Sequence, residues 1–324
     1  MIDFAMLAGG LVLLYFGAEW LVGGAARLAE SFGIAPLIVG LTVVAYGTSS
    51  PELVVGIGAA LRDQGEIALG NVVGSNVANI GLILAVAALI TPPRIDPILA
   101  RREVWVLLGT TALVPLSLLG GGVQWWDGAV LVSLAVVYTV WMVKTARDPA
   151  VMPESDVHVR VMAEAADQAA PGKMPRSRAA LAGIALVGLA LLVGGGHLLV
   201  EGAIGLARTF GMSERIIGLT IVAIGTSLPE LATSVIAAMR GHSDIAVGNV
   251  LGSNIFNVLL ILGAASVTRS IDADVSSIAL DLVVLGAMTV AAAIVIRTRQ
   301  QLSRVEGLVL LLGYISFLSA LALT

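Results

Sequence analysis

The chain has 324 residues, of which 58% are apolar and 12% charged, with a formal net charge of −4 and no cysteine. Soluble domains have roughly 45–50% apolar and about 25% charged residues, so this composition excludes a soluble globular protein and indicates a membrane protein. The lack of cysteine excludes disulfides and thiol chemistry, and the 18 Lys and Arg residues are too few to favour nucleic acid as a partner.

Apolar stretches long enough to cross a bilayer recur along the whole chain. About 20 apolar residues suffice for a transmembrane helix, and ten such stretches are present, at 3–29, 33–61, 66–90, 103–119, 126–146, 179–207, 212–239, 244–268, 276–296 and 304–323. The first lacks the basic segment of a signal peptide, so we expect a retained helix. The sequence therefore predicts an all-α polytopic membrane protein with ten transmembrane helices, which we expect to function as a monomer in the lipid bilayer.

A polar segment separates the fifth stretch from the sixth. It carries four prolines and mixed charge, which predicts a linker over 144–178 between an N-terminal half, 1–143, and a C-terminal half, 179–324. Lys and Arg in short loops favour the cytoplasmic side. A cytoplasmic linker places fourteen basic residues inside and only four outside. We therefore expect an inner-membrane protein with a cytoplasmic linker and both termini outside the cytoplasm.

The two halves repeat each other at an offset of 178 residues. GLTVVAYGTSSPEL at 40–53 and GLTIVAIGTSLPEL at 218–231 are identical at eleven of fourteen positions. EIALGNVVGSNVAN at 66–79 and DIAVGNVLGSNIFN at 244–257 match at nine of fourteen, mostly at polar residues and glycines. Because an odd number of crossings separates equivalent helices, the second copy must run in the opposite direction. The sequence thus predicts two inverted five-helix repeats, which are typical of secondary transporters.

The first repeated motif, GTSSPE at 47–52 and GTSLPE at 225–230, places an acid inside an apolar span. Its proline has no N–H and opens the preceding turn, so we expect free carbonyls there. Its threonine and first serine lie near the face of the acid. A kink alone would explain Gly and Pro, but not Glu52 and Glu230, because a carboxylate at the bilayer centre costs at least ~2.5–3.5 kcal/mol. These oxygens predict a site for a hard cation such as calcium or sodium.

The second repeated motif places Asn, Ser and Asn at four-residue intervals along one helical stripe, at 71, 75 and 79 and again at 249, 253 and 257. We interpret four asparagines as hydrogen-bonding residues between helices, namely Asn71, Asn76, Asn249 and Asn254. The other four residues are candidate neutral ligands, namely Ser75, Asn79, Ser253 and Asn257. With both glutamates ionised the site carries a formal charge of −2, so we expect calcium and sodium to compete for it, and protons to compete with both.

Paired GTSxPE and GNxxGSNxxN segments resemble the α-repeats of the calcium/cation antiporter superfamily, closest to those of prokaryotic sodium/calcium exchangers. The resemblance covers nearly the whole chain, with α-repeats at about 33–90 and 211–268. It implies calcium exchange for sodium by alternating access, with helices one and six sliding against the others, no enzymatic activity, and no cofactor besides the transported ions.

The resemblance also implies roles for individual residues. Glu52 and Glu230 would bind calcium together with the carbonyls of Thr48 and Thr226. The groups implied for sodium and for the middle of the site are the carbonyls of Ala45 and Ala223, the side chains of Ser49, Ser75, Ser227 and Ser253, and those of Asn79 and Asn257.

One departure from the family and several alternatives remain. Several relatives, including potassium-dependent exchangers, have Asp where this chain has Asn257, so we expect no potassium requirement, and the coupling number stays open. A calcium/proton exchanger is the main alternative, although such relatives usually have histidine beside the acid, whereas Leu53 and Leu231 follow it here. An intramembrane hydrolase is disfavoured because Asp281 is the only well-placed membrane aspartate, and inverted repeats with broken helices favour a carrier over a channel.

Overall fold

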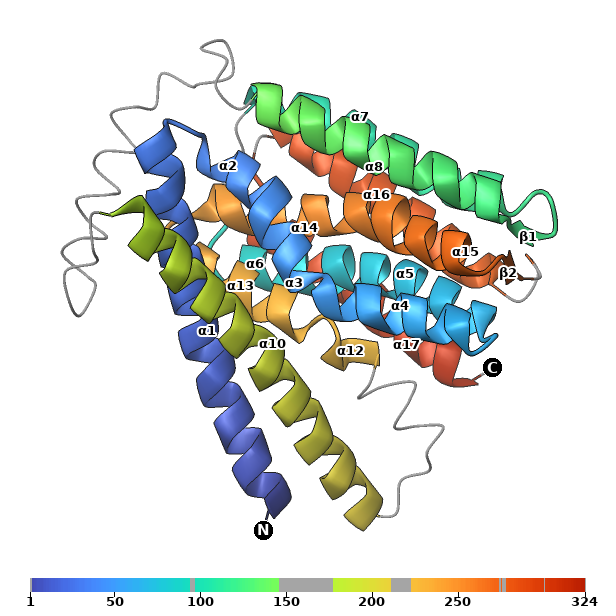
Figure 1. The fold of residues 1–324 in the computed structure, drawn as a ribbon, viewed down its shortest axis with the longest axis horizontal. Coiled ribbons are helices and arrows are strands. Elements are labelled where there is room, and N and C mark those ends of the chain that lie inside the picture. The colour runs from blue at the N-terminus through green and yellow to red at the C-terminus, as the bar shows by residue number, and fades with distance from the viewer. Residues whose placement is uncertain are drawn as a thin grey trace.

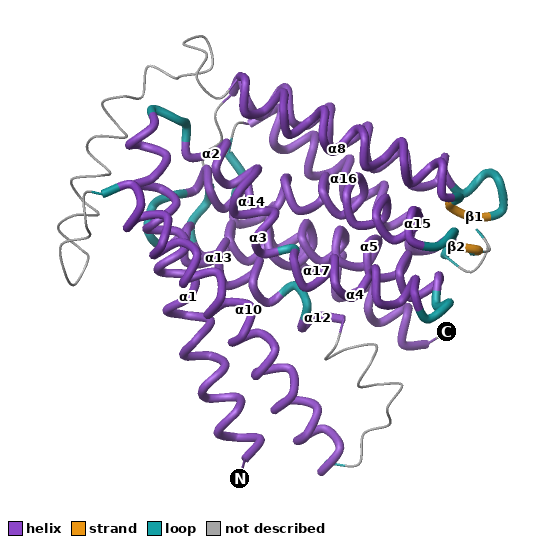
Figure 2. Tube along the Cα trace, viewed as in Figure 1, coloured by secondary structure: helices purple, strands orange, loops and turns teal. Residues whose placement is uncertain are grey.

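The computed structural model describes residues 2–93, 97–145, 177–210, 223–273, 275, 278–299 and 301–323. Apart from one pair of two-residue strands, its regular structure is helical (Figure 1 and Figure 2). Two long helices, α1 and α10, lie side by side at a steep angle to the other helices and project beyond them (Figure 1).

The N-terminal half is built from helices that contain breaks at defined places. In chain order its elements are α1 (Ile2–Phe32), α2 (Pro36–Val39), the π-helical turn η1 (Gly40–Val44), α3 (Ala45–Thr48), α4 (Ser50–Leu61), α5 (Gly65–Ala78), the π-helical turn η2 (Asn79–Leu84), α6 (Ala85–Ile90), α7 (Pro97–Ser117), β1 (Gly122–Val123) and α8 (Trp125–Thr145). The α5–η2–α6 segment is continuous and forms one span.

The C-terminal half follows the same order where it is described. Its elements are α10 (Arg178–Thr209), α12 (Ala223–Gly225), α13 (Leu228–Met239), α14 (Ser243–Phe256), the π-helical turn η4 (Asn257–Leu262), α15 (Gly263–Thr268), β2 (Ile271–Asp272), α16 (Ala279–Arg299) and α17 (Arg304–Leu323). The α14–η4–α15 segment is the most deeply buried of the candidate spans, followed by its equivalent α5–η2–α6. These two segments therefore form the centre of the bundle.

Eight of the ten predicted spans have a counterpart that is long and apolar enough to cross a membrane. Seven described stretches meet this requirement individually, and the bent pair Leu37–Thr48 and Ser50–Leu61 makes eight. The span predicted at 103–119 is α7, which begins earlier and has three charged residues near its start. The span predicted at 212–239 is described only from residue 223, and most of the predicted linker also lies outside the described residues. Ten spans therefore remain a prediction.

Glycines at seven-residue intervals form the contact between α1 and α10. They are Gly10, Gly17, Gly24, Gly188, Gly195 and Gly202. A Cβ atom added to Gly17 would lie 2.8 Å from the carbonyl oxygen of Gly188, and one added to Gly195 would lie 3.0 Å from that of Gly10. The two helices are therefore antiparallel and in backbone contact. The offset of 178 residues converts each of these pairs into the other, so the contact has two-fold symmetry, as inverted repeats require.

The short strands join the two halves at one end of the bundle. β1 pairs antiparallel with β2, with Gly122 opposite Asp272, and so connects the α7–α8 turn to the segment that follows α15 (Figure 1). Gly122 has φ of 148°, and a Cβ there would lie 2.3 Å from the carbonyl oxygen of Ile271. Only glycine fits this backbone conformation and this close approach.

Candidate cation-binding site

Both GTSxPE motifs lie at breaks between helices. Ser49, with φ −82° and ψ 10°, separates α3 from α4, and Ser227, with φ −89° and ψ 7°, separates α12 from α13. Each motif's proline occupies the first turn of the new helix, where its missing N–H breaks no helical hydrogen bond. Glu52 and Glu230 lie in the same first turns, where the helix dipole favours a carboxylate.

The carbonyl that Pro51 releases in the first half is not free. The hydroxyl of Ser50 donates a hydrogen bond to the carbonyl oxygen of Gly47 at 2.6 Å. The carbonyl of Ala45 accepts the N–H of Ser49 at 3.0 Å, and the Thr48 hydroxyl lies 3.5 Å from the same oxygen. The expected row of free carbonyls is therefore partly satisfied, because a neighbouring serine reaches back. Leu228 stands at the equivalent of Ser50 in the second half, so the hydroxyl cap belongs to the first half alone.

Each buried carboxylate is held by a serine of the opposite half. Ser49 Oγ donates to Glu230 Oε1 at 2.9 Å, and Ser227 Oγ donates to Glu52 Oε1 at 3.3 Å. Both glutamates are 1% exposed, and the two carboxylates repel each other electrostatically. The serines and glutamates predicted from the two motifs therefore form one cluster shared between the halves.

Further predicted residues surround this cluster. Thr48 is fully buried and its hydroxyl lies 3.1 Å from Asn249 Oδ1, and Thr226 directly precedes Ser227 at the break between α12 and α13. Ser253 Oγ lies 3.0 Å from Ser49 Oγ and is fully buried. Two predicted residues have fewer described contacts: Ser75, the equivalent of Ser253, is buried, and Ala223 is the first residue of α12.

The asparagines predicted to connect helices do so. Asn71 Nδ2 donates to the backbone carbonyl of Glu52 at 3.0 Å, and its equivalent Asn249 donates to that of Glu230 at 3.3 Å. Asn76 and Asn254 each donate to the other's backbone carbonyl, at 3.2 and 3.4 Å. This interpretation is confirmed for all four residues.

The central asparagines, like the two glutamates, have a buried oxygen without a partner. Among the described residues, six buried side-chain atoms have no hydrogen-bond partner, and four of them belong to the repeated motifs: Glu52 Oε2, Glu230 Oε2, Asn79 Oδ1 and Asn257 Oδ1. All four are acceptors. A buried acceptor left without a partner costs about 1–3 kcal/mol, and more when it is charged. Two of these oxygens come from each half, and acceptors of this kind can be satisfied by a cation but not by an anion.

The π-helical turns at this site were not predicted from the sequence. Asn79 is the first residue of η2 and Asn257 is the first residue of η4. Such turns occur frequently at functional sites, because they change the direction of side chains within a helix. A π-helical turn adds one residue to a single helical turn. In these short segments the spacing of apolar residues is too regular to show where that residue is inserted.

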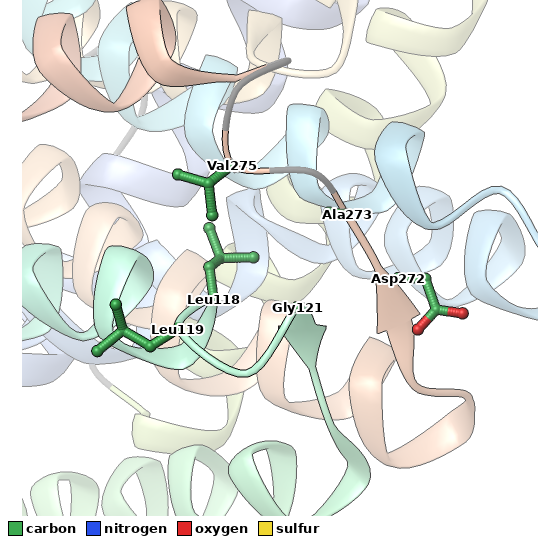
Figure 3. Close-up of a pocket in the computed structure, with 6 residues that line it drawn as sticks. All are labelled: Leu118, Leu119, Gly121, Asp272, Ala273 and Val275. Carbon is green, nitrogen blue, oxygen red and sulfur yellow. The ribbon is translucent and has the colours of Figure 1, made fainter.

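A surface hollow elsewhere in the molecule is not part of this cluster. It has a volume of about 630 Å³ and lies beside the β1–β2 pair, whereas the glutamates lie at the α3–α4 and α12–α13 breaks (Figure 3 and Figure 1). Its lining is mostly apolar and consists of Leu118, Leu119, Gly121, Asp272, Ala273 and Val275.

Comparisons with known proteins agree on one family. The family described as sodium/calcium exchanger protein matches residues 2–144 and 180–323. Inner membrane protein YrbG of Escherichia coli (strain K12) is 36% identical over 320 residues, 98% of this chain and 96% of that protein. Sodium/calcium exchanger MaX1 of Methanosarcina acetivorans is 32% identical over 348 residues, 99% of this chain and 98% of that protein. The solved structure of the sodium-calcium exchanger NCX_Mj, soaked with Na+ and Ca2+, superimposes with a TM-score of 0.83 at 30% identity, covering 99% of both chains.

Proposed function

The chain belongs to the sodium/calcium exchanger protein family, and on this premise we propose that it is an antiporter that exchanges calcium for sodium. The family consists of membrane cation exchangers and not of enzymes. The observation that carries the proposal is the set of four unpaired buried oxygens contributed equally by the two halves. With both glutamates ionised, one calcium ion or two sodium ions neutralise the site, so one ion species displaces the other.

We propose that some site residues bind calcium and others bind sodium, as the family resemblance implies. Glu52 and Glu230 bind calcium together with the carbonyls of Thr48 and Thr226. The serines and central asparagines of the two motifs, with the carbonyls of Ala45 and Ala223, provide neutral oxygens for sodium. The crossed hydrogen bonds from Ser49 and Ser227 to the glutamates support this assignment, because they hold both carboxylates in one cluster.

Alternating access fits the relation between the two halves. The antiparallel α1–α10 contact, the matching helix breaks and the constant offset support ten helices in two inverted repeats. A Cβ added to Gly47 would meet the side chain of Leu189, and one added to Gly225 would meet that of Val200. Both residues belong to α10, so this helix packs on both broken motifs. In the proposed cycle α1 and α10 move together, and their movement opens the site first to one side and then to the other.

The proposal also states where the protein is located and that its transport does not require potassium. The relative from Escherichia coli is named an inner membrane protein, which supports the inner membrane. The basic residues support a cytoplasmic linker over 144–178 and termini outside the cytoplasm. Asn257 in place of a carboxylate supports transport without potassium, because the site then has no third acid. We expect the monomer to be sufficient.

Uptake of calcium-45 into proteoliposomes with an imposed sodium gradient tests the proposal. We expect sodium-driven uptake by the parent without potassium, and none by Glu52→Gln or Glu230→Gln, because each removes one formal charge from the site. Glu66→Gln is the matched control, since Glu66 is exposed in the first turn of α5. Either site variant transporting at the parental rate would refute the assignment.

The same vesicles separate sodium coupling from proton coupling. A proton gradient imposed in sodium-free medium drives little uptake if sodium is the coupling ion. Uptake that follows the proton gradient and ignores sodium would identify a calcium/proton exchanger instead. In both cases uptake falls as pH is lowered, because protons compete with calcium for the two carboxylates.

A further inference from the structure

Four asparagines form a closed arrangement of hydrogen bonds across the two halves. Asn79 Nδ2 donates to Asn254 Oδ1 at 2.9 Å, and Asn257 Nδ2 donates to Asn76 Oδ1, also at 2.9 Å. Asn76 Nδ2 and Asn254 Nδ2 donate to each other's backbone carbonyls. All four residues are about 1% exposed, so none of these amides has water as a substitute partner.

The backbone carbonyls determine the direction of every hydrogen bond in this arrangement. A carbonyl oxygen can only accept, so Asn254 must direct its NH2 group towards the carbonyl of Asn76. Its Oδ1 is then on the other side, where it can only accept from Asn79. Asn79 must therefore direct its NH2 group towards Asn254 and its oxygen away from it. The same reasoning from the carbonyl of Asn254 fixes Asn257 through Asn76.

The orientation matters because the two ends of a carboxamide have nearly the same shape and opposite polarity. The oxygens of Asn79 and Asn257 are two of the four unpaired buried acceptors. If either side chain rotated by half a turn, it would present an NH2 group to the cation in place of an oxygen. An aspartate has no such wrong orientation, since both its terminal atoms are oxygens.

We propose that Asn76 and Asn254 are positioning residues that hold the carboxamides of Asn257 and Asn79 with their oxygens directed at the transported cation. Each half thereby orients the neutral ligand of the other half. The proposal rests on the exchanger function proposed above and adds two residues that do not themselves offer a free oxygen. It also explains how a site with Asn257 presents only oxygen while its formal charge stays at −2.

A double-mutant cycle tests this role, with purified full-length protein and calcium chloride as the probe. The variants are Asn254→Ala, Asn79→Asp and the combination, and the readout is the calcium-dependent rise in the midpoint of thermal unfolding, with sodium-driven calcium-45 uptake alongside. Loss of residues that orient metal ligands weakens affinity roughly 10–100-fold. We expect Asn254→Ala to weaken apparent calcium affinity in this range when Asn79 is present, and to leave it unchanged or improved in the Asn79→Asp background. In that background the lost Oδ1 faces a carboxylate that needs no orientation, while the bond from Asn254 to the carbonyl of Asn76 is lost in both backgrounds and cancels in the comparison.

A packing role predicts a different result, because an alanine that merely loosens the helices weakens binding equally in both backgrounds. Equal weakening in both backgrounds, or no weakening in the parent background, would overturn the proposal. Asn76→Ala with Asn257→Asp is the symmetric cycle and serves if Asn254→Ala does not fold. A parent protein without calcium-induced stabilisation and without sodium-driven uptake would overturn the exchanger function itself, before any variant is compared.

Discussion

Replacing Gly195 by alanine tests the backbone contact between α1 and α10. The added Cβ would lie 2.8 Å from the backbone nitrogen of Leu14 and 2.8 Å from the Cβ of Leu13. Ordinary contact begins at 3.4 Å, so the helices must separate by about 0.6 Å, the difference between 3.4 and 2.8 Å. Overpacking of this kind costs about 1–3 kcal/mol.

The adjacent residue provides the matched control. Gly194 is in the same helix, and among the described residues nothing lies within 4 Å of an added Cβ. Both substitutions gain roughly 0.5–1 kcal/mol of helix propensity, so the difference between the two variants isolates the clash. We expect Gly195→Ala to be about 1–3 kcal/mol less stable than Gly194→Ala, measured as the midpoint of thermal unfolding in detergent. Equal midpoints, or a higher one for Gly195→Ala, would refute the close approach of the two helices.

Three further predictions concern stability. Burial and the guanidinium groups of Arg240 and Arg27 lower the pKa of His242 from its usual 6.5. The folded state therefore binds fewer protons than the unfolded chain, so the stability of the protein decreases as pH falls through about 6.5. His242→Gln should reduce this decrease, which is measured as the midpoint of thermal unfolding across that pH range. Calcium at about 100 times its Kd should stabilise the parent by about 2.7 kcal/mol, and a chelator should remove this gain; no shift of the midpoint would contradict a calcium site. Tyr138 donates to the fully buried Glu103 at 2.7 Å, so Tyr138→Phe leaves a carboxylate oxygen unpaired and should destabilise the protein by about 1–3 kcal/mol; an unchanged midpoint would contradict this.

The sequence was sufficient to identify the motifs that meet at the centre of the bundle. Polar residues repeated at equivalent positions of two apolar halves have few explanations besides a shared site. The parity of crossings then places the two copies face to face. The hydrogen bonds from Ser49 to Glu230 and from Ser227 to Glu52 agree with this proximity, and the asparagines between the helices form hydrogen bonds as predicted, whereas the role of these residues as cation ligands stays a prediction.

Other features could not be derived from a single sequence. The direction of a carboxamide depends on which backbone carbonyl lies opposite it, and only coordinates identify that carbonyl. The Ser50 hydroxyl that occupies the carbonyl of Gly47 is likewise a matter of local geometry. The span at 103–119 was predicted to start too late, because Arg101 and Arg102 were assigned to the preceding loop, whereas the helix begins at Pro97. The glycine heptad in α1 and α10 was visible in the sequence, but its meaning required knowing that the two helices are neighbours.

The crossed serine–glutamate hydrogen bonds also impose an order on biosynthesis. Ser227 leaves the ribosome 175 residues after Glu52, its hydrogen-bond acceptor. Until then the nascent N-terminal half carries an acid at membrane depth without its second-half partner, a penalty of at least ~2.5–3.5 kcal/mol on insertion scales. The first five helices are therefore an unfinished intermediate that translation of the second half completes, and a stop codon in the linker would leave a polypeptide for the quality-control proteases.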